Sequence, residues 1–392
     1  LAEFGWERGV TAGAFSFGFV VSMLFTPLLG ALMDRWGPRR VIPAGVTLVA
    51  AGLALGTLVR QPWHLYLTLG LLVAAGSVTV GYTGQSLYLP SWFARRRGMA
   101  LGVAFSGVGI GSAIMFPWLQ ALIDRAGWRA GCWALAVVLL VVLVPLNAVL
   151  PRARPEELGL GPDGDPPGSA GKGGHAADVV DPAWAAVDWT LARALRTARF
   201  WWLGLGFFGA LFAWYAVQVH QTKYLVEIGF HPTMAAWALG LVGLTGVAGQ
   251  IALGHLSDRI GREWVWTAGN AGFVLSYAAL LAMAQAPTPA LLYAMVAAQG
   301  LLGYGLASIY GAIPAELFQG RHYGTIFGAL GLASGFGAGL GPWLAGVLHD
   351  RTGSYAPGFW LAIAGSLVSI AAVWLAAPRK VRAVAGRLPA AR

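Results

Sequence analysis

The stretch GALMDRWGPRR, Gly30 to Arg40, follows a long apolar segment and is the most polar run near the start of the chain. A near copy, GHLSDRIGRE, runs from Gly254 to Glu263. Four positions coincide at a constant offset of 224 residues: Gly30 with Gly254, Asp34 with Asp258, Arg35 with Arg259, and Gly37 with Gly261. A charged hinge that occurs twice at one spacing predicts that the chain is a duplication.

The composition indicates that the chain lies in a lipid bilayer. Of its 392 residues, 57% are hydrophobic and only 11% are charged, whereas soluble domains carry roughly 25% charged residues. The 56 glycines and 18 tryptophans agree with this, because Gly is frequent in membrane helices and Trp at their interfaces. The single cysteine, Cys132, excludes an intrachain disulfide and a CxxC metal or redox site, and we expect no metal and no cofactor.

Eleven segments have the length of about 20 largely apolar residues that a membrane helix needs. They are 10–31, 41–59, 65–89, 99–122, 129–150, 199–222, 233–255, 264–285, 289–312, 323–348 and 356–377. Residues 151–198 are polar and rich in Gly, Pro and Asp, which is typical of a linker. Near its end, DWTLARALRTARF places Arg193, Arg196 and Arg199 at helical spacing, as in a helix on the membrane surface.

These segments predict an all-α membrane protein in four parts. Residues 1–150 form an N-terminal half, 151–198 a central linker, 199–378 a C-terminal half and 379–392 a basic tail. The linker side carries 20 of the 26 Lys and Arg residues, so the positive-inside rule places the linker and C-terminus in the cytoplasm and Leu1 outside. The excess of Lys and Arg over Asp and Glu is therefore explained by membrane topology and gives no reason to expect nucleic-acid binding. We expect a bacterial plasma membrane.

A second repeat supports the duplication. PWLQALIDRAGW from Pro117 matches PWLAGVLHDRTG from Pro342 at an offset of 225, which grows to 226 within the stretch. A duplicated membrane bundle is the architecture of many transporters. Only one span precedes the first hinge, whereas two spans lie between the linker and the second hinge. The simplest explanation is that a first helix is absent from this sequence through fragmentation or a misassigned start, and a natural protein of eleven spans is the alternative.

The two hinges resemble the signature loop of the major facilitator superfamily. Within it, FGWERG, SWFARRRGMA, DRAGWR and PEELGLGPDG resemble stretches of the monocarboxylate-transporter and oxalate–formate-antiporter group. The resemblance implies two pseudo-symmetric six-helix halves that rock around a central site, so that a monomer transports a solute by alternating access.

The resemblance also implies that Asp34, Arg35, Asp258 and Arg259, with the hinge glycines, form a breakable latch between the halves on the cytoplasmic side. A carboxylate near a helix N-terminus is stabilised by the helix dipole, so such a latch is physically sound. The alternative is that these residues only anchor tight loops.

By family position, solute contacts should come from the third, sixth and ninth spans, where polar side chains lie in an apolar setting. The candidates, together with one residue of the seventh span, are Tyr82, Gln85, Tyr215, Gln218, His220, Gln250 and Tyr304. Each either contacts the solute or makes an interhelical hydrogen bond. His220 either carries a proton or is a neutral side chain bonded to a carbonyl.

Gln250 stands where the resembled group carries a substrate-binding arginine. A carboxylate solute in a low-dielectric cavity needs a fixed cation. Either the absent helix supplies that charge, or the solute is neutral or zwitterionic.

Two other classes are weighed against a transporter. A membrane-embedded enzyme would need clustered metal ligands or paired carboxylates, yet the seven histidines show no HxxxH or HxxEH spacing and no two acidic residues share a span. A sensor built on a transporter fold would usually add a large soluble domain, for which the linker is too short and too polar. We therefore expect a secondary or facilitative transporter of a small organic solute, with a coupling proton or an exchanged anion as its other partner.

Overall fold

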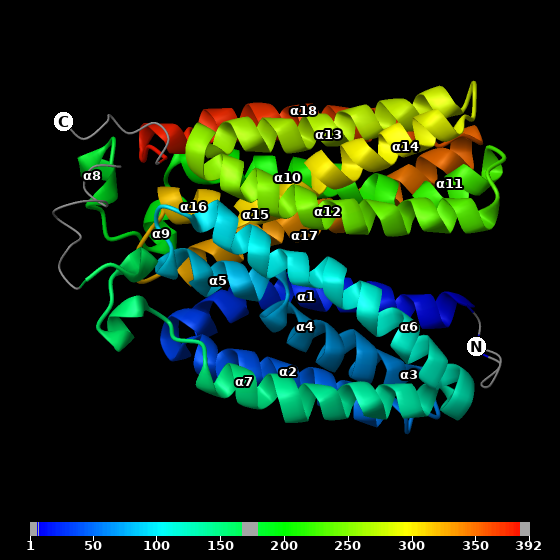
Figure 1. Ribbon diagram of the computed structural model, residues 1–392, viewed down its shortest axis with the longest axis horizontal. Coiled ribbons are helices and arrows are strands. Elements are labelled where there is room, and N and C mark those ends of the chain that lie inside the picture. Colours follow the sequence, from blue (N-terminus) through cyan, green and yellow to red (C-terminus); the bar gives the residue numbers. More distant parts are fainter. Residues whose placement is uncertain (1–5, 7, 167–178, 385–392) are drawn as a thin grey trace.

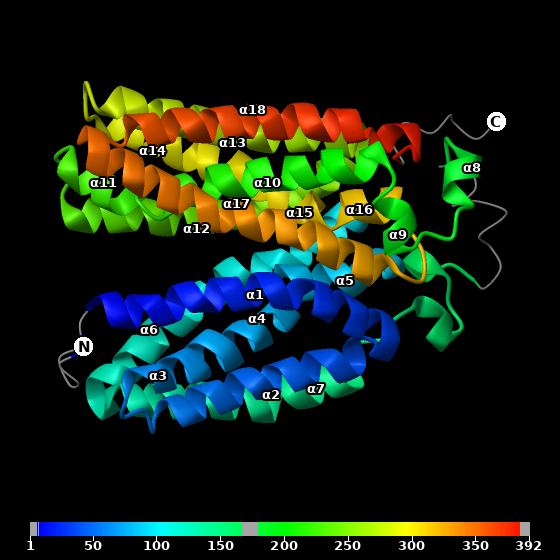
Figure 2. The same cartoon turned by 180° about the vertical axis from the view of Figure 1, so that it is seen from behind.

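The computed structural model describes residues 6, 8–166 and 179–384. Their regular elements are helices, and the described part forms no β-strand beyond one bridge between Val179 and Arg382. Figures 1 and 2 show two helical bundles side by side, the N-terminal half in blue to teal and the C-terminal half in green to red, with the linker at one end.

Ten helical stretches of the described chain are long and apolar enough to cross a membrane. One of them, Arg97–Val149, has 53 residues and is broken at Gly127, whose φ of 82° is a conformation that glycine adopts without strain. The chain turns back there, so this stretch forms two antiparallel spans (Figure 1). The expectation of an all-α membrane protein is confirmed, and counting this stretch as two gives eleven candidate spans in the part of the chain that the structure describes.

In the N-terminal half, the hinge joins two long helices and the third span is segmented. The elements are α1 (Arg8–Trp36), α2 (Pro38–Gly56), α3 (Pro62–Leu65), the π-helix η1 (Tyr66–Val73), α4 (Ala74–Val80), α5 (Tyr82–Trp92), α6 (Arg97–Val138), the π-helix η2 (Leu139–Leu143) and α7 (Val144–Val149).

The C-terminal half repeats this plan. Its elements are α10 (Ala198–Gln218), α11 (Gln221–Glu227), α12 (Pro232–Ile260), α13 (Arg262–Met283), α14 (Pro289–Ala297), the π-helix η6 (Ala298–Leu302), the 3₁₀ turn η7 (Gly303–Gly305), α15 (Leu306–Tyr310), α16 (Ala312–Leu317), α17 (Tyr323–Thr352) and α18 (Ala356–Ala376).

The halves meet through two equivalent helix pairs. The helix before the first hinge, α1, packs on α17, and the helix before the second hinge, α12, packs on α6. Each hinge turns at a glycine with positive φ, 73° at Gly37 and 109° at Gly261. Glycine occupies that region without the clash that a Cβ would cause, so the hinge sequence dictates the sharp turn between its helices.

The described parts of the linker contain only short helices: η3 (Pro155–Leu158), η4 (Pro162–Gly164), α8 (Pro182–Ala185) and α9 (Leu191–Ala194). The spacing of Arg193, Arg196 and Arg199 predicts one surface helix, but the structure does not place the three arginines in a single helix. The side chain of Thr197 accepts a hydrogen bond from the Phe200 N–H at 3.4 Å and begins a new helix, α10. Arg193 therefore belongs to α9, whereas Arg199 lies in α10 with its guanidinium carbon 4.1 Å from the Trp184 ring centroid.

Candidate solute cavity and gate

The second hinge holds the N-terminal half through its carboxylate. Asp258, at the end of α12, accepts hydrogen bonds from the backbone N–H groups of Gly98 and Met99, both at 2.9 Å. These groups lie in the first turn of α6, where backbone N–H groups have no partner within the helix. The negative carboxylate satisfies them and complements the positive end of the helix dipole.

The first hinge makes the equivalent contact in the opposite direction. Asp34, near the end of α1, accepts bonds from the backbone N–H groups of Gly324 (2.8 Å) and Thr325 (2.7 Å) and from the Thr325 hydroxyl (2.7 Å). Gly324 and Thr325 open α17, in the C-terminal half. Each hinge acid thus caps a helix of the other half, and we call the two together the reciprocal caps.

Glycines allow the backbones to approach at these caps. A Cβ on Gly30 would collide with the Gly324 carbonyl oxygen, and one on Gly254 would collide with the Gly98 carbonyl oxygen. The two hinge helices therefore contact the two capped helices backbone to backbone at this end of the protein.

The second cap carries additional charges. Arg262 donates to Asp258 at 2.7 Å and to Glu316 at 2.7 Å, and the three side chains are between 2% and 6% exposed. Because a buried ion pair is stable only when its charges remain matched, the three groups act as one unit.

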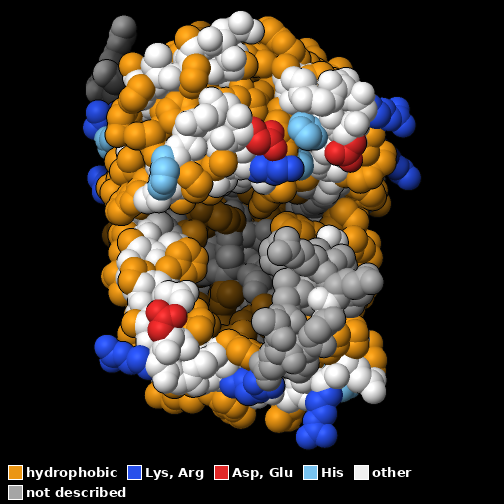
Figure 3. All heavy atoms as spheres, turned by 90° about the vertical axis from the view of Figure 1, so that its right-hand side faces the viewer, with side chains coloured by type: hydrophobic (Ala, Val, Ile, Leu, Met, Phe, Trp, Pro, Cys, Tyr) orange, Lys and Arg blue, Asp and Glu red, His pale blue; other side chains and the backbone are white. Residues whose placement is uncertain are grey.

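A central cavity of about 330 Å³ lies between the halves. Residues of α1, α4, α5, α10, α13, α15 and α17 line it: Phe19, Ser22, Met23, Thr26, Val78, Gly81, Tyr82, Thr83, Ala210, Leu211, Trp214, Tyr215, Trp266, Leu306, Ala307, Tyr310, Gly331, Ser334, Gly335 and Ala338. Figure 3 looks onto the end of the molecule away from the linker and shows a hollow between the two halves.

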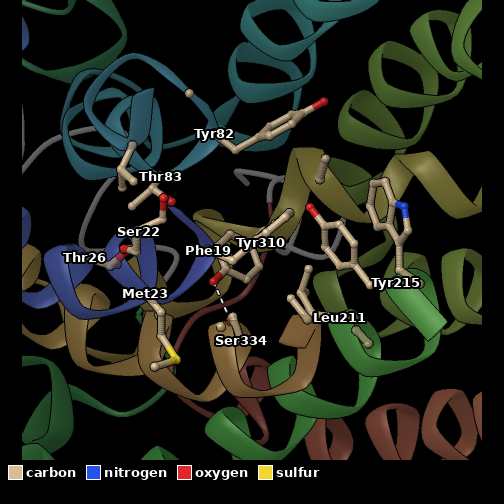
Figure 4. Close-up of a pocket in the computed structure, with 18 of the residues that line it drawn as sticks. Phe19, Ser22, Met23, Thr26, Tyr82, Thr83, Leu211, Tyr215, Tyr310 and Ser334 are labelled. Atoms are coloured by element: carbon tan, nitrogen blue, oxygen red, sulfur yellow. Dashed lines mark hydrogen bonds between the residues drawn. The ribbon is translucent and has the colours of Figure 1, made fainter. Parts of the chain in front are cut away.

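The described lining is apolar with interspersed hydroxyl groups. Figure 4 shows Tyr82 and Tyr215 facing the cavity from opposite halves. The hydroxyl groups of Tyr310 and Ser334 are hydrogen-bonded to each other at 2.6 Å, drawn as a dashed line in Figure 4. No charged side chain occurs among the described residues that line the cavity.

Comparison with known proteins assigns the family. The sequence profile of the Major Facilitator Superfamily matches residues 1–230 and 221–391. The chain belongs to the major facilitator superfamily. It is a multi-pass membrane transporter of the monocarboxylate-transporter group.

Relatives of this transporter include monocarboxylate transporter 13 of Bos taurus, which is 30% identical over 91% of this chain and 78% of the relative. Monocarboxylate transporter 11 of Mus musculus is also 30% identical, over 94% and 79%. Among solved structures, the fucose:proton symporter FucP of E. coli, captured in the outward conformation, covers 96% of this chain and 92% of its own with a TM-score of 0.69 and 17% identity. The human organic anion transporter MFSD10 covers 94% and 83% with a TM-score of 0.64 and 18% identity. Both share the fold of this transporter.

Of the predicted solute contacts, two line the cavity of this transporter. These are Tyr82 and Tyr215. Gln250, on α12, lies near the Tyr82 hydroxyl of the other half and is 3% exposed, and its Oε1 atom has no hydrogen-bond partner among the described residues.

The other predicted contacts make hydrogen bonds away from the described lining. Gln85 accepts from Tyr88 at 2.9 Å. The Nε2 atom of His220 lies 3.0 Å from the Pro342 carbonyl oxygen, which is an interhelical contact. Gln218 donates to Tyr304 at 3.5 Å and accepts from Gln299 at 3.1 Å.

The hinge arginines differ from the hinge acids. Arg35 is exposed and lies 5.7 Å from the Trp36 ring centroid, and Arg259 is also exposed. Their placement fits loop anchoring, whereas Asp34 and Asp258 bridge the halves.

Sequence reasoning missed several residues of the cavity and gate. Ser22, Thr26, Thr83, Tyr310 and Ser334 line the cavity, and Arg262 and Glu316 support the second cap. Ser22 and Thr26 stand at i, i+4 in an apolar span, a spacing that puts both on one helix face and could have identified them.

Proposed function

We propose that this chain is a secondary transporter that moves a small organic solute by alternating access, and that the closed linker end is its cytoplasmic gate. The reciprocal caps carry the proposal. Two carboxylates hold two helix N-termini across the halves through bonds of 2.7–2.9 Å, and the cavity lies between the same halves. Rocking that breaks both caps would open this end to the cavity.

The sidedness rests on the distribution of basic residues. The linker side carries most of the Lys and Arg, and such loops remain in the cytoplasm. The gate would then be closed inside and the cavity open outside, which is an outward-open state. The same charge distribution supports a cytoplasmic C-terminus. From the family resemblance we also propose a plasma-membrane location and a monomer as the functional unit.

The described lining favours a solute with an apolar body and at least one hydrogen-bonding group. Aromatic side chains of both halves supply apolar contact, and Tyr82 and Tyr215 supply hydroxyl groups that donate or accept. The names of the relatives make monocarboxylates the first solutes to assay. Matched amides provide the second set, because Gln250 offers a neutral hydrogen bond where the group carries a cation.

Uptake into proteoliposomes tests the function. Radiolabelled lactate and lactamide have nearly the same shape and differ in charge, so the pair measures solute charge preference directly. We expect the wild-type protein to accumulate at least one of them, and Asp258→Asn to lower the rate with membrane insertion intact. Uptake that equals protein-free liposomes for both probes, or an Asp258→Asn variant at the wild-type rate, would contradict the proposal.

Two further measurements address coupling and specificity. An imposed pH gradient that accelerates uptake would identify a coupling proton, whereas acceleration by internal solute alone would identify exchange. Gln250→Ala should change the KM for the transported probe, because it removes a buried amide beside the cavity residue Tyr82. An unchanged KM would assign Gln250 a purely structural role.

A further inference from the structure

A second cavity, of about 260 Å³, lies at the linker end between the halves. We call it the gate pocket. It is lined by Met33, Asp34, Pro38, Leu87, Tyr88, Pro90, Ser91, Arg97, Ala153, Arg154, Glu156, Pro162, Ala315, Gln319, Gly320, Arg321 and Tyr323. The N-terminal half, the linker and the C-terminal half all contribute, and one of the reciprocal caps forms part of its wall.

The gate pocket exists because the duplication is imperfect. At the second cap, Arg262 and Glu316 fill the space beside Asp258 with a buried ion pair. The equivalent positions in the first half, at offsets of 224 and 226, hold Pro38 and Pro90. Both prolines line the gate pocket. Two uncharged, short side chains thus leave open the volume that a guanidinium and a carboxylate fill in the copy.

One arginine of the gate pocket lacks the ion-pair partners that its copy in the N-terminal half has. Arg95 is paired with Asp165 at 2.9 Å and with Asp163 at 3.6 Å. Its equivalent in the C-terminal half, Arg321, is exposed and has no ion pair or side-chain hydrogen bond to the described residues, and the same is true of Arg154 on the linker.

A third cation is fixed in the wall. Arg97 is 5% exposed, and its Nε atom donates to the carbonyls of Pro90 (3.0 Å) and Phe93 (2.8 Å). The acidic residues of the described lining are Asp34 and Glu156. The Asp34 oxygens already accept three hydrogen bonds from α17, and Glu156 is exposed. The pocket therefore has a formal excess of positive charge and two guanidinium groups available to a ligand.

We propose that the gate pocket binds a small multivalent oxyanion of the phosphate type, held by Arg154 and Arg321. Guanidinium groups bind such oxygens with paired, charge-assisted hydrogen bonds. The volume, just below the usual range of ligand pockets, suits a small ligand. Because Arg154 follows the N-terminal half and Arg321 belongs to the C-terminal half, one anion would tie the halves together beside Asp34.

Binding would therefore favour the closed gate. A ligand shifts a conformational equilibrium by the difference in its affinity for the two states, and an anion that contacts both halves loses one set of contacts when they separate. The site itself goes beyond the proposed transport function, and only its inhibitory effect rests on that function.

Pyrophosphate binding to the full chain in phosphatidylcholine nanodiscs tests the site, with titration calorimetry as the readout. We expect Arg154→Gln and Arg321→Gln each to weaken binding about ten-fold, the loss of one charge-assisted contact. The matched control is Arg196→Gln, which removes the same charge from an exposed linker residue outside the pocket and should bind as the wild type does. No binding by the wild type, or equal binding by all four proteins, would overturn the free-anion site.

A spin-label pair reports the conformational effect and the source of the phosphate group. The background protein carries Cys132→Ser with Arg40→Cys and Trp264→Cys, two exposed positions in the first turns of α2 and α13. Pyrophosphate should narrow the inter-label distance distribution unless Arg321 is replaced. If discs with phosphatidic acid and no pyrophosphate narrow it in the same Arg321-dependent way, the pocket takes the phosphate from a lipid headgroup. A distribution insensitive to both would refute the coupling to the gate.

Discussion

Replacing Asp34 with asparagine changes one atom of the first cap and is expected to open the linker end of the protein. The carboxylate uses both oxygens, one for the Gly324 N–H and the other for the N–H and hydroxyl of Thr325. An amide keeps one oxygen and turns an NH₂ group toward a donor. The substitution therefore removes at least one bond and the negative charge at the start of α17.

The bonds give the size of the effect. A hydrogen bond to a charged group contributes about 1.5–3 kcal/mol, and the charge at a helix N-terminus contributes about 0.3–1 kcal/mol. Their sum, about 2–4 kcal/mol, stabilises only the closed gate, because the two halves separate in the open one. Since each 1.4 kcal/mol is tenfold, the ratio of closed to open protein should fall roughly 30- to 700-fold.

Distances between spin labels at Arg40→Cys and Trp264→Cys measure that ratio. The matched control is Asp350→Asn, the same chemical change on a side chain that is 84% exposed at the other end of α17, and it should leave the distribution unchanged. A change below about threefold for Asp34→Asn, less than 1 kcal/mol, would refute the assignment of this carboxylate to the gate.

Three other substitutions give distinct readouts. Gly30→Ala drives a Cβ into the facing backbone carbonyl of α17, whereas Gly107→Ala meets nothing within 4 Å, so only the first should widen the label distances. Glu316→Gln removes one of the two carboxylates that pair with the buried Arg262 guanidinium. It should lower the free energy of unfolding by about 3–5 kcal/mol, measured as a lower Tm. An unchanged Tm would contradict the view that Arg262, Asp258 and Glu316 act as one unit. Tyr82→Phe keeps the ring but removes a hydroxyl group from the cavity wall. The KM for the transported probe should rise several-fold, because one hydrogen bond contributes about 1 kcal/mol, and stability should be unchanged. A wild-type KM would exclude a contact between this hydroxyl and the solute.

The fold could be predicted because its determinants are local. Bilayer thickness sets the length of each apolar run, and the two hinges repeat four residues at one offset. The role of the hinge acids Asp34 and Asp258 could be predicted from the same repeat. Their partners could not, because the groups that they bind are backbone N–H groups of Gly98, Met99, Gly324 and Thr325, and a backbone donor leaves no mark in the sequence.

The cavity was harder to predict, since it depends on helix register. Tyr82 and Gln85 share a face at i, i+3, yet only Tyr82 lines the cavity, and Gln85 bonds to Tyr88 within α5. Tyr304 lies in the 3₁₀ turn η7, behind a π-helical segment. Such segments change the rotation per residue, so a regular α-helical projection misplaces every side chain that follows them.

The two segmented spans, α3 to α5 in the N-terminal half and α14 to α16 in the C-terminal half, have a mechanical consequence. Each is interrupted beside the cavity, at Gly81 before α5 and at η7 before α15, and the adjoining residues Tyr82, Thr83, Leu306 and Ala307 line the cavity wall. A helix bends most easily where its hydrogen-bond ladder is broken, whereas the hinge helix α12 has no proline in its interior and is an unbroken lever. The places where these helices bend most easily are therefore the surfaces that a solute in the cavity contacts. Loading the cavity and flexing the protein become a single event, and no separate relay from the cavity to a remote joint is required.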